Sequence, residues 1–439
     1  MRKDLLVSIV SLSSLILFAG CASNDSDASN NSNENTNSEI TNNNATEEEE
    51  TVTIQLFNNK VEIHDELLDL AREYQSENSH VRIEIESLSA DDYPSQLTTK
   101  FSAGESPDIF RVLGHSGLET WVEYLEDLSD QPWVDNMIES TKPAATFDDK
   151  IYGMPLGIEG LGYIYNKDLF DEAGITEVPT TFTEMEEAVA KLNEAGISPF
   201  VSSFAETFNP GFFATNNAFA KQEDPSAFME GLSEGTASFT DNEIFNQWLD
   251  LIDLEIDNAH KDPMSIGYSE QVTDFATEQG AITLSTNSLQ SLLDEINPDL
   301  NLGMMPMPLN DDEHLNDRLF SNVPFYWGIH NESEVKEEAK EFLTWLSMSE
   351  AGERYITEEF KHIPPFTTME ADSELIGPLA NDVQQYANEK PSLALEWNKF
   401  PTGLAPQLGS ALQKYVSYES DREELLAEFQ RLWDSMKDQ

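Results

Sequence analysis

The hydrophobic pattern that follows Thr51 switches repeatedly between a two-residue period and a helical period, and this switching restricts the fold more than any other feature. Apolar residues alternate over 52–56, share one helical face over 67–74, and alternate again over 81–85. A strand, a helix and a second strand in this order predict an α/β sheet with helices on both faces.

The same rhythm continues along the rest of the chain. Further strands are predicted over 108–113, 199–202 and 281–284, and further amphipathic helices over 183–193, 335–346 and 425–436. The chain has 439 residues, which is too long for one small domain and suits two α/β lobes.

The first 20 residues have the features of a secretory signal peptide. Arg2 and Lys3 precede an apolar run over 5–18, which is too short and serine-rich for a membrane span. Cys21 is the only cysteine and cannot form an internal disulfide. Residues 18–21 resemble the bacterial lipobox, which implies lipidation of Cys21 and a lipid anchor on the extracellular face of the cell membrane. An ordinary signal peptide followed by a chance cysteine is the alternative.

Residues 21–50 are expected to form a disordered acidic tether that starts at Cys21. The segment consists almost wholly of Asn, Ser, Thr, Asp and Glu. It has too little apolar surface to offset the entropy lost on ordering. Its predicted role is to let the folded body swing clear of the lipid surface.

The formal net charge of −59 comes from 24 basic and 83 acidic side chains. Such a chain has too few cations to neutralise a phosphate backbone, so nucleic acid is excluded as a partner. A body this acidic repels itself in dilute buffer, and salt screens that repulsion. We therefore expect a halophilic protein, with an extracellular protein of an alkaliphile as the alternative.

Five segments together resemble one known family. They are residues 51–60, the turn at 104–109, the stretch 152–170, the strand 280–286 and the helix around 339–343. The most specific is YGMP at 152–155 followed by YIYNKDLF at 163–170. In order and spacing these segments resemble the extracellular solute-binding proteins of ABC importers, in particular the maltose-binding-like carbohydrate family. The resemblance covers essentially all of the chain after the tether.

The resemblance implies a two-lobed periplasmic-binding-protein-like (venus-flytrap) α/β fold with hinge crossings near 154–158, 326–329 and 363–366. The first lobe is expected to combine 51–157 with 329–366, and the second 158–328 with 367–439. It also implies a monomer without a cofactor that binds a carbohydrate, most simply an oligosaccharide, between its lobes and delivers it to the ABC permease subunits.

A sugar needs hydrogen-bonding groups around its edge and flat aromatic rings against its apolar face. Asn59 and Lys60 follow the first strand, in a loop that the resemblance assigns to the ligand. His115 follows the third strand at the corresponding edge. For Lys60 the alternative is a solvated side chain, and for His115 it is a structural role.

Glu159 is the strongest single candidate, because it lies among glycines at the first crossing. Its alternative role is a hinge salt bridge. Glu206 and Phe208 match a loop that supplies an acid and an aromatic platform in the family. Asn287 follows a buried strand, where relatives often carry a tryptophan that is missing here.

Trp327 and Trp397 complete the candidate ligand-binding set, because neither belongs to an obvious helical stripe. Trp397 is expected to stack on the sugar, whereas core packing is the alternative for Trp327. The seven histidines are scattered, so no metal site is expected.

Two other functions stay open. The first is a secreted glycan-processing enzyme, for which acidic pairs alone are no argument in so acidic a chain. The second is a binding protein of the same fold for a non-sugar solute such as a polyamine, iron or a glycerol phosphate. A phosphate ligand suits an acidic protein with few site cations poorly.

Overall fold

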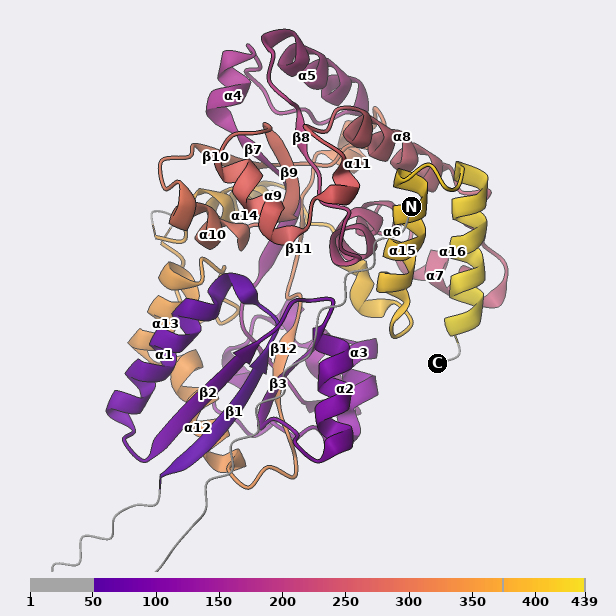
Figure 1. Cartoon of the computed structure of the whole chain (residues 1–439). Coiled ribbons are helices and arrows are strands. Elements are labelled where there is room, and N and C mark those ends of the chain that lie inside the picture. The colour runs from indigo at the N-terminus through magenta and orange to yellow at the C-terminus, as the bar shows by residue number, and fades with distance from the viewer. Residues whose placement is uncertain (1–50, 373–374, 438–439) are drawn as a thin grey trace, which may run out of the picture. The chain divides into compact units, whose positions relative to one another are not determined.

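The computed structural model describes residues 51–372 and 375–437, which form two β-sheets covered by helices (Figure 1). The predicted signal peptide, Cys21 and the tether over 21–50 lie outside the described residues. None of the helices in the described part of the chain is both long and apolar enough to cross a membrane.

The first sheet has the strand order β2-β1-β3-β12-β6. Its first three strands are parallel, and β12 runs antiparallel to both β3 and β6. The strands are β1 (Val52–Asn58), β2 (Val81–Ser87), β3 (Ile109–Val112), β6 (Met154–Pro155) and β12 (Tyr326–Ile329).

Helices cover both faces of the first sheet (Figure 1). On one face, Tyr74 of α1 (His64–Glu77) packs against Phe342 of α12 (Lys336–Met348), with ring centroids 5.1 Å apart. On the other, Phe101 of α2 (Tyr93–Ala103) contacts Trp121 of α3 (Ser116–Trp121), and both rings contact Phe110 of β3. This layering confirms the α/β architecture predicted from the hydrophobic periods.

The second sheet has the order β10-β7-β9-β8, and β11 also pairs with β7. Here β9 runs antiparallel to β7 and parallel to β8. The strands are β7 (Glu159–Asn166), β8 (Phe200–Val201), β9 (Ile282–Thr286), β10 (Leu302–Met305) and β11 (Phe320–Asn322).

Neighbouring residues of β7 belong to different apolar clusters, so this sheet is also buried on both faces. Ile164 packs in the cluster formed with α9 (Tyr268–Ala276), α10 (Leu289–Ile296) and α14 (Pro378–Glu389). Tyr163 packs in the larger cluster. The helices of that larger cluster are α4 (Lys167–Glu172), α5 (Phe182–Ala195), α6 (Thr215–Ala220), α7 (Pro225–Glu234), α8 (Glu243–Asp257), α15 (Leu404–Val416) and α16 (Arg422–Met436).

Local sequence signals explain several element boundaries. Thr181 and Glu184 form a capping box at the start of α5, and Gly196 ends this helix with a positive φ of 78°.

The predicted strands correspond to β1, β2, β3, β8 and β9, and the predicted helices to α1, α5, α12 and α16. Other short elements include β4 (Thr146–Phe147), β5 (Lys150–Ile151), α11 (Glu313–Asn316) and α13 (Glu350–Arg354).

The chain passes between the two sheets at 156–158 and 323–325, and a third passage lies between Phe360, in the apolar cluster of the first sheet, and Ile376, in the cluster that contains α14. The first and third passages pair with each other. The Ile158 N–H donates to the Ile363 carbonyl at 2.8 Å, and the Ile363 N–H donates back at 3.3 Å. The second passage precedes the position expected at 326–329, because those residues pair with β3. The expected lobe boundary after residue 328 therefore falls inside β12, a strand of the first sheet.

Candidate functional site

A cavity of about 250 Å³ lies where the ends of strands from both sheets meet the second crossing. The side of the first sheet contributes Asn59, Lys60, Val61, Glu62, Ser89, Ala90, Asp91 and Arg111. The side of the second sheet contributes Glu159, Ser203, Glu206, Phe208, Asn209, Phe212, Phe213, Tyr268, Ser269, Ser285, Thr286 and Trp397, and Pro324 and Phe325 come from the second crossing.

Lys60 is the centre of a charged cluster at the floor of the cavity. Asn58, the last residue of β1, shapes the loop by donating to the Lys60 carbonyl at 3.0 Å. The Lys60 ammonium donates to Glu62 at 2.8 Å, to Glu159 at 2.9 Å and to the Ser288 hydroxyl at 2.9 Å. All three donors of the ammonium are thus used within the protein.

Glu159 opens β7 and is almost fully buried, with 1% of its surface exposed. It accepts a hydrogen bond from Thr286 at 2.8 Å, and His362 lies 3.6 Å away. Burial alone would raise the pKa of Glu159, but Lys60, His362 and the hydrogen bonds lower it below its ordinary value. Burial also works against the charge on Lys60, yet Glu159 and Glu62 raise the Lys60 pKa.

His362 faces this cluster from the third crossing. Burial lowers the pKa of His362 to about 4, and the charge on Lys60 acts in the same direction while Glu159 opposes it. The imidazole is therefore neutral near pH 7. The negative charge of Glu159 is therefore balanced by Lys60 and not by the histidine. Glu159 thus forms a salt bridge at the hinge and also lines the cavity.

An aromatic wall forms the opposite side of the cavity. Phe208 stacks on Phe212, with ring centroids 4.9 Å apart, and Phe213 lies 5.7 Å from Trp397. Phe212 and Phe213 belong to a π-helical turn, η6 (Asn209–Ala214). This turn packs directly on α15, because a Cβ on Gly211 would collide with the backbone of that helix.

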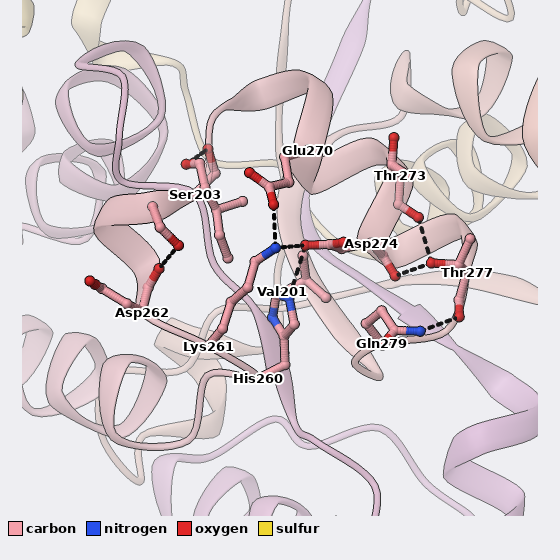
Figure 2. Close-up of polar contacts among 12 residues, drawn as sticks. Val201, Ser203, His260, Lys261, Asp262, Glu270, Thr273, Asp274, Thr277 and Gln279 are labelled. Carbon is pink, nitrogen blue, oxygen red and sulfur yellow. Dashed lines mark hydrogen bonds and ion pairs between the residues drawn. The ribbon is translucent and has the colours of Figure 1, made fainter.

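Helix α9 brings Tyr268 into the cavity and is held from two sides. On the inner side, Gln271 accepts a hydrogen bond from Asn209 at 2.8 Å and donates to Thr283 at 2.8 Å. On the outer side, Figure 2 shows Asp274 in contact with both His260 and Lys261. Those contacts measure 2.9 Å and 2.7 Å, and Lys261 also pairs with Glu270. The helix start that carries Tyr268 is thereby fixed.

The Tyr268 hydroxyl lies in an acidic environment. Burial raises the pKa of Tyr268 well above its ordinary value, and the charges of Glu62, Glu159 and Glu206 add to this effect. Glu206 lies at the exposed rim of the cavity, and partial burial raises its pKa as well. Tyr268 therefore remains a neutral hydroxyl that can donate or accept a hydrogen bond.

Arg111 extends from β3 into the cavity and stacks between two aromatic rings. Its guanidinium carbon lies 4.9 Å from the centroid of Phe325 and 5.9 Å from that of Tyr93. Its Nε is buried without a hydrogen-bond partner, and Arg111 forms no ion pair with any residue in the described ranges. Burial lowers the pKa of Arg111 to about 10, against the opposing effects of Tyr93, Glu159 and Glu62.

Six of the nine residues predicted from the sequence line this cavity, namely Asn59, Lys60, Glu159, Glu206, Phe208 and Trp397. The other three lie elsewhere. Trp327 is fully buried in the core of the first sheet. Asn287 joins two backbone segments, accepting from the Gly160 N–H at 2.7 Å and donating to the Lys361 carbonyl at 3.1 Å. His115 precedes α3, and burial together with the nearby Lys399 lowers its pKa.

Sequence reasoning did not single out Arg111, Tyr268, Phe325, Phe212 or Glu62. Arg111 did carry a signal, because it is the one charged residue inside the otherwise apolar run 109–113. Phe325 lies in a crossing that was expected three residues later. Tyr268 follows Gly267 at the start of a helix, a position that has no chemical signature of its own.

Direct hydrogen bonds also join the two sides of the cavity at its edge. Asp91, which follows β2, accepts from the Thr207 N–H and hydroxyl, both at 3.0 Å. Outside this cavity, Ser116 donates to the Phe400 carbonyl at 2.8 Å. In residues 51–372 and 375–437, no three His, Cys, Asp or Glu side chains gather in a way that could hold a metal ion.

Two curated relatives cover most of this chain at low identity. The multiple sugar-binding protein of Streptococcus mutans serotype c (strain ATCC 700610 / UA159) is 21% identical, over 81% of this chain and 80% of its own length. The melibiose/raffinose/stachyose-binding protein MelE of Bacillus subtilis (strain 168) is 22% identical, over 79% of this chain and 81% of its own length.

A solved structure described as the solute-binding protein RafE in complex with raffinose shares the fold. Its TM-score is 0.77 at 19% identity, and the match covers 88% of this chain and 100% of RafE. The sequence model for bacterial extracellular solute-binding proteins matches residues 60–353. This chain is therefore a two-lobed α/β protein that belongs to the bacterial extracellular solute-binding protein family.

Proposed function

We propose that this protein binds an oligosaccharide in its cavity and delivers it to the permease subunits of an ABC importer, without altering the ligand. One observation carries the proposal: an aromatic wall faces a floor of hydrogen-bonding groups across the same cavity. A sugar ring has an apolar face for the first and hydroxyls for the second.

Two acceptors in the cavity are free to take sugar hydroxyls. The side-chain oxygens of Asn59 and Asn209 are buried and have no hydrogen-bond partner. A buried acceptor without a partner costs stability of about 1–3 kcal/mol, so a hydroxyl donor from a ligand would be favoured at both positions. Asn59 follows β1 and Asn209 begins η6, so they approach the cavity from opposite sheets.

Contacts from both sides are what link ligand binding to closure. A ligand shifts an open-to-closed equilibrium only by its differential affinity for the two states. In our proposal Asn59 and Arg111 contact the ligand from the first lobe and Phe208, Tyr268 and Trp397 from the second, while the ion pair of Lys60 with Glu159 lies between them. His115, Asn287 and Trp327 have no proposed contact with the ligand in the present geometry.

The names of relatives support a sugar over other solutes. The curated relatives described above are named for sugars or for melibiose, raffinose and stachyose, and the RafE structure contains raffinose. The charge arrangement argues against Glu159 as the general acid of a glycosidase. Glu159 is ion-paired with its pKa lowered, whereas a glycosidase general acid needs a raised pKa.

We further propose that the protein is exported, lipidated at Cys21 and held outside the cell by the tether over 21–50, where it works as a monomer. The support is the sequence pattern of residues 1–50 and its match to the extracellular character of the family. Substituting Cys21 by Ser should release the protein from the membrane fraction into the medium. Retention of that variant with the membranes would contradict the anchor.

The proposed function is tested by calorimetry and thermal unfolding of the purified chain with a panel of oligosaccharides at high salt. A binding sugar should raise the melting temperature with concentration, because it stabilises the native state by mass action. Parallel titrations with a polyamine, ferric iron and glycerol phosphate test other solutes. Release of reducing sugar would indicate an enzyme, and a panel without any sugar that binds would overturn the proposal.

The acidic composition leads us to propose a salt-adapted protein. The formal charge of −59 produces self-repulsion that screening reduces. The unfolding midpoint should therefore rise from low to molar NaCl. An unchanged midpoint across that range would refute salt adaptation and favour the alkaline alternative.

A further inference from the structure

Arg111 differs from the other arginines that the structure describes. Each of those has an oxygen partner: Arg72, Arg82, Arg354, Arg422 and Arg431 pair with carboxylates, and Arg318 donates to backbone carbonyls. Arg111 has neither kind of partner. In a chain with 83 acidic and 24 basic side chains, Arg111 is the exception among the described arginines, because its side chain has no oxygen partner at all.

Aromatic rings fix the orientation of the Arg111 guanidinium. Phe325 on the second crossing lies 4.9 Å from its central carbon, and Tyr93 on α2 lies 5.9 Å away. The Tyr93 hydroxyl also accepts from the Arg111 backbone N–H at 2.8 Å, which holds strand and helix together. A planar guanidinium held by ring faces keeps its N–H groups directed along its edge, toward the cavity that Arg111 lines.

The nearby carboxylates are already committed to another cation. Glu62 and Glu159 both bind the Lys60 ammonium, at 2.8 Å and 2.7 Å. The floor therefore holds two cations and two anions, but both anions are directed at Lys60. The charge on Arg111 is balanced only from a distance, and its donors remain open.

We propose that the ligand presents a carboxylate to Arg111, which makes the substrate class an oligosaccharide with a uronic acid unit. This inference rests on the proposed function. A carboxylate accepts two parallel N–H bonds from a guanidinium, whereas a hydroxyl offers a single oxygen without charge. The open oxygens of Asn59 and Asn209 then serve hydroxyls of the same ligand.

The surroundings favour a group of single negative charge. A phosphate carries up to two negative charges and would lie in a cavity that also contains Glu62, Glu159, Asp91 and Glu206. Only one open cation is present to offset it, because Lys60 is saturated. A carboxylate matches this single positive charge.

The test compares three matched probes by calorimetry with the full chain at high salt: α-1,4-linked digalacturonate, its dimethyl ester and the corresponding galactose disaccharide. The same design is repeated with glucuronate and glucose disaccharides. At least one of the two acidic disaccharides should bind about tenfold or more tightly than both its ester and its neutral counterpart, because charge-assisted hydrogen bonds are stronger than neutral ones. This comparison needs no variant.

A variant series locates the effect. Arg111→Gln should abolish the preference for the acid over the ester, and Arg111→Lys should recover only part of it, since an ammonium lacks the planar fork. Arg82→Gln is the matched control, because Arg82 is exposed on β2 and its loss changes the net charge equally. Circular dichroism of each variant confirms the fold.

The outcomes separate the two proposals. Neutral disaccharides that bind as tightly as the acids would overturn the carboxylate inference and leave oligosaccharide binding intact. An acid preference that survives Arg111→Gln would also overturn it. If none of these disaccharides binds but another oligosaccharide of the panel does, the carboxylate inference is wrong and the proposed function stands; if no sugar of the panel binds, both are wrong.

Discussion

Two cations line the cavity, and their surroundings are opposite. Lys60 is enclosed by two carboxylates and a hydroxyl, all within 2.9 Å of its ammonium. Arg111 is enclosed by aromatic rings and has a buried Nε without a partner. The cost of removing each charge from water is offset inside the protein at Lys60 only. The Lys60 cluster thus stabilises the structure of the site, while Arg111 remains available to bind a group of the ligand.

Replacing Lys60 by Met gives the sharpest test of this comparison. The change leaves Glu159 and Glu62 buried without their cation, which should lower the free energy of unfolding by about 3–5 kcal/mol. Urea unfolding at high salt measures the loss. The control is Lys150→Met, because Lys150 forms an exposed pair with Asp127 at 2.9 Å. An equal loss in both variants would show that the Lys60 cluster does not stabilise the structure of the site.

A pH experiment tests the same cluster through His362. Its folded-state pKa of about 4 lies below the ordinary 6.5. The unfolded chain therefore binds this proton first, so stability should fall as the pH drops from about 6.5 to about 4. The contribution is about 3 kcal/mol at most, because each pKa unit corresponds to about 1.4 kcal/mol.

Replacing His362 by Asn should remove this part of the acid-induced loss. The exposed His314 provides the control, and His314→Asn should retain the full pH dependence of the wild-type protein. Unfolding curves at a series of pH values between 4 and 7 make the comparison. Identical slopes in the His362 variant and the wild type would contradict a buried neutral imidazole beside Glu159.

Replacing Arg111 by Met should not lower the free energy of unfolding, in contrast to the replacement of Lys60 by Met. Removing a buried charge that has no partner should leave the ligand-free protein unchanged or stabilise it by about 1 kcal/mol. The same variant should lose affinity for the ligand. Urea unfolding without ligand provides the measurement. A loss of unfolding free energy as large as that of Lys60→Met would show that Arg111 also stabilises the structure of the site.

The smallest effect is expected at the Tyr268 hydroxyl. Tyr268→Phe removes one polar group from the cavity and leaves the ring and α9 in place, so stability should change by no more than about 0.5 kcal/mol. Affinity for a binding sugar should fall several-fold, by the loss of one neutral hydrogen bond of about 1 kcal/mol. Unchanged affinity would place the ligand away from the start of α9.

The sequence predicted that certain residues line the cavity where this position follows from their place in the chain. Lys60 lies two residues after the end of β1 and Glu159 directly after the first crossing, and strand ends of α/β sheets face a shared site. Elements with clear periodicity and caps, such as α5 between Thr181 and Gly196, were also predictable. These positions depend on local pattern and on the order of elements.

The remaining site residues depend on tertiary geometry. Arg111 looks like part of an apolar strand until its neighbours Phe325 and Tyr93 are known. Trp327 has the chemistry of a sugar platform, but its place in β12 buries it in the core. Asn287 matches a ligand-binding position, yet both ends of its side chain are used by backbone groups. Side-chain direction, which decides all three, is absent from the pattern of residue types.

The position of β12 has a consequence for how the polypeptide assembles. This strand lies between β3 and β6 in the first sheet, although every strand of the second sheet precedes it in the chain. The core of the second sheet in turn needs α14, α15 and α16. Neither sheet can complete its core until the last third of the chain has been synthesised. Folding of the two lobes is therefore completed late and together.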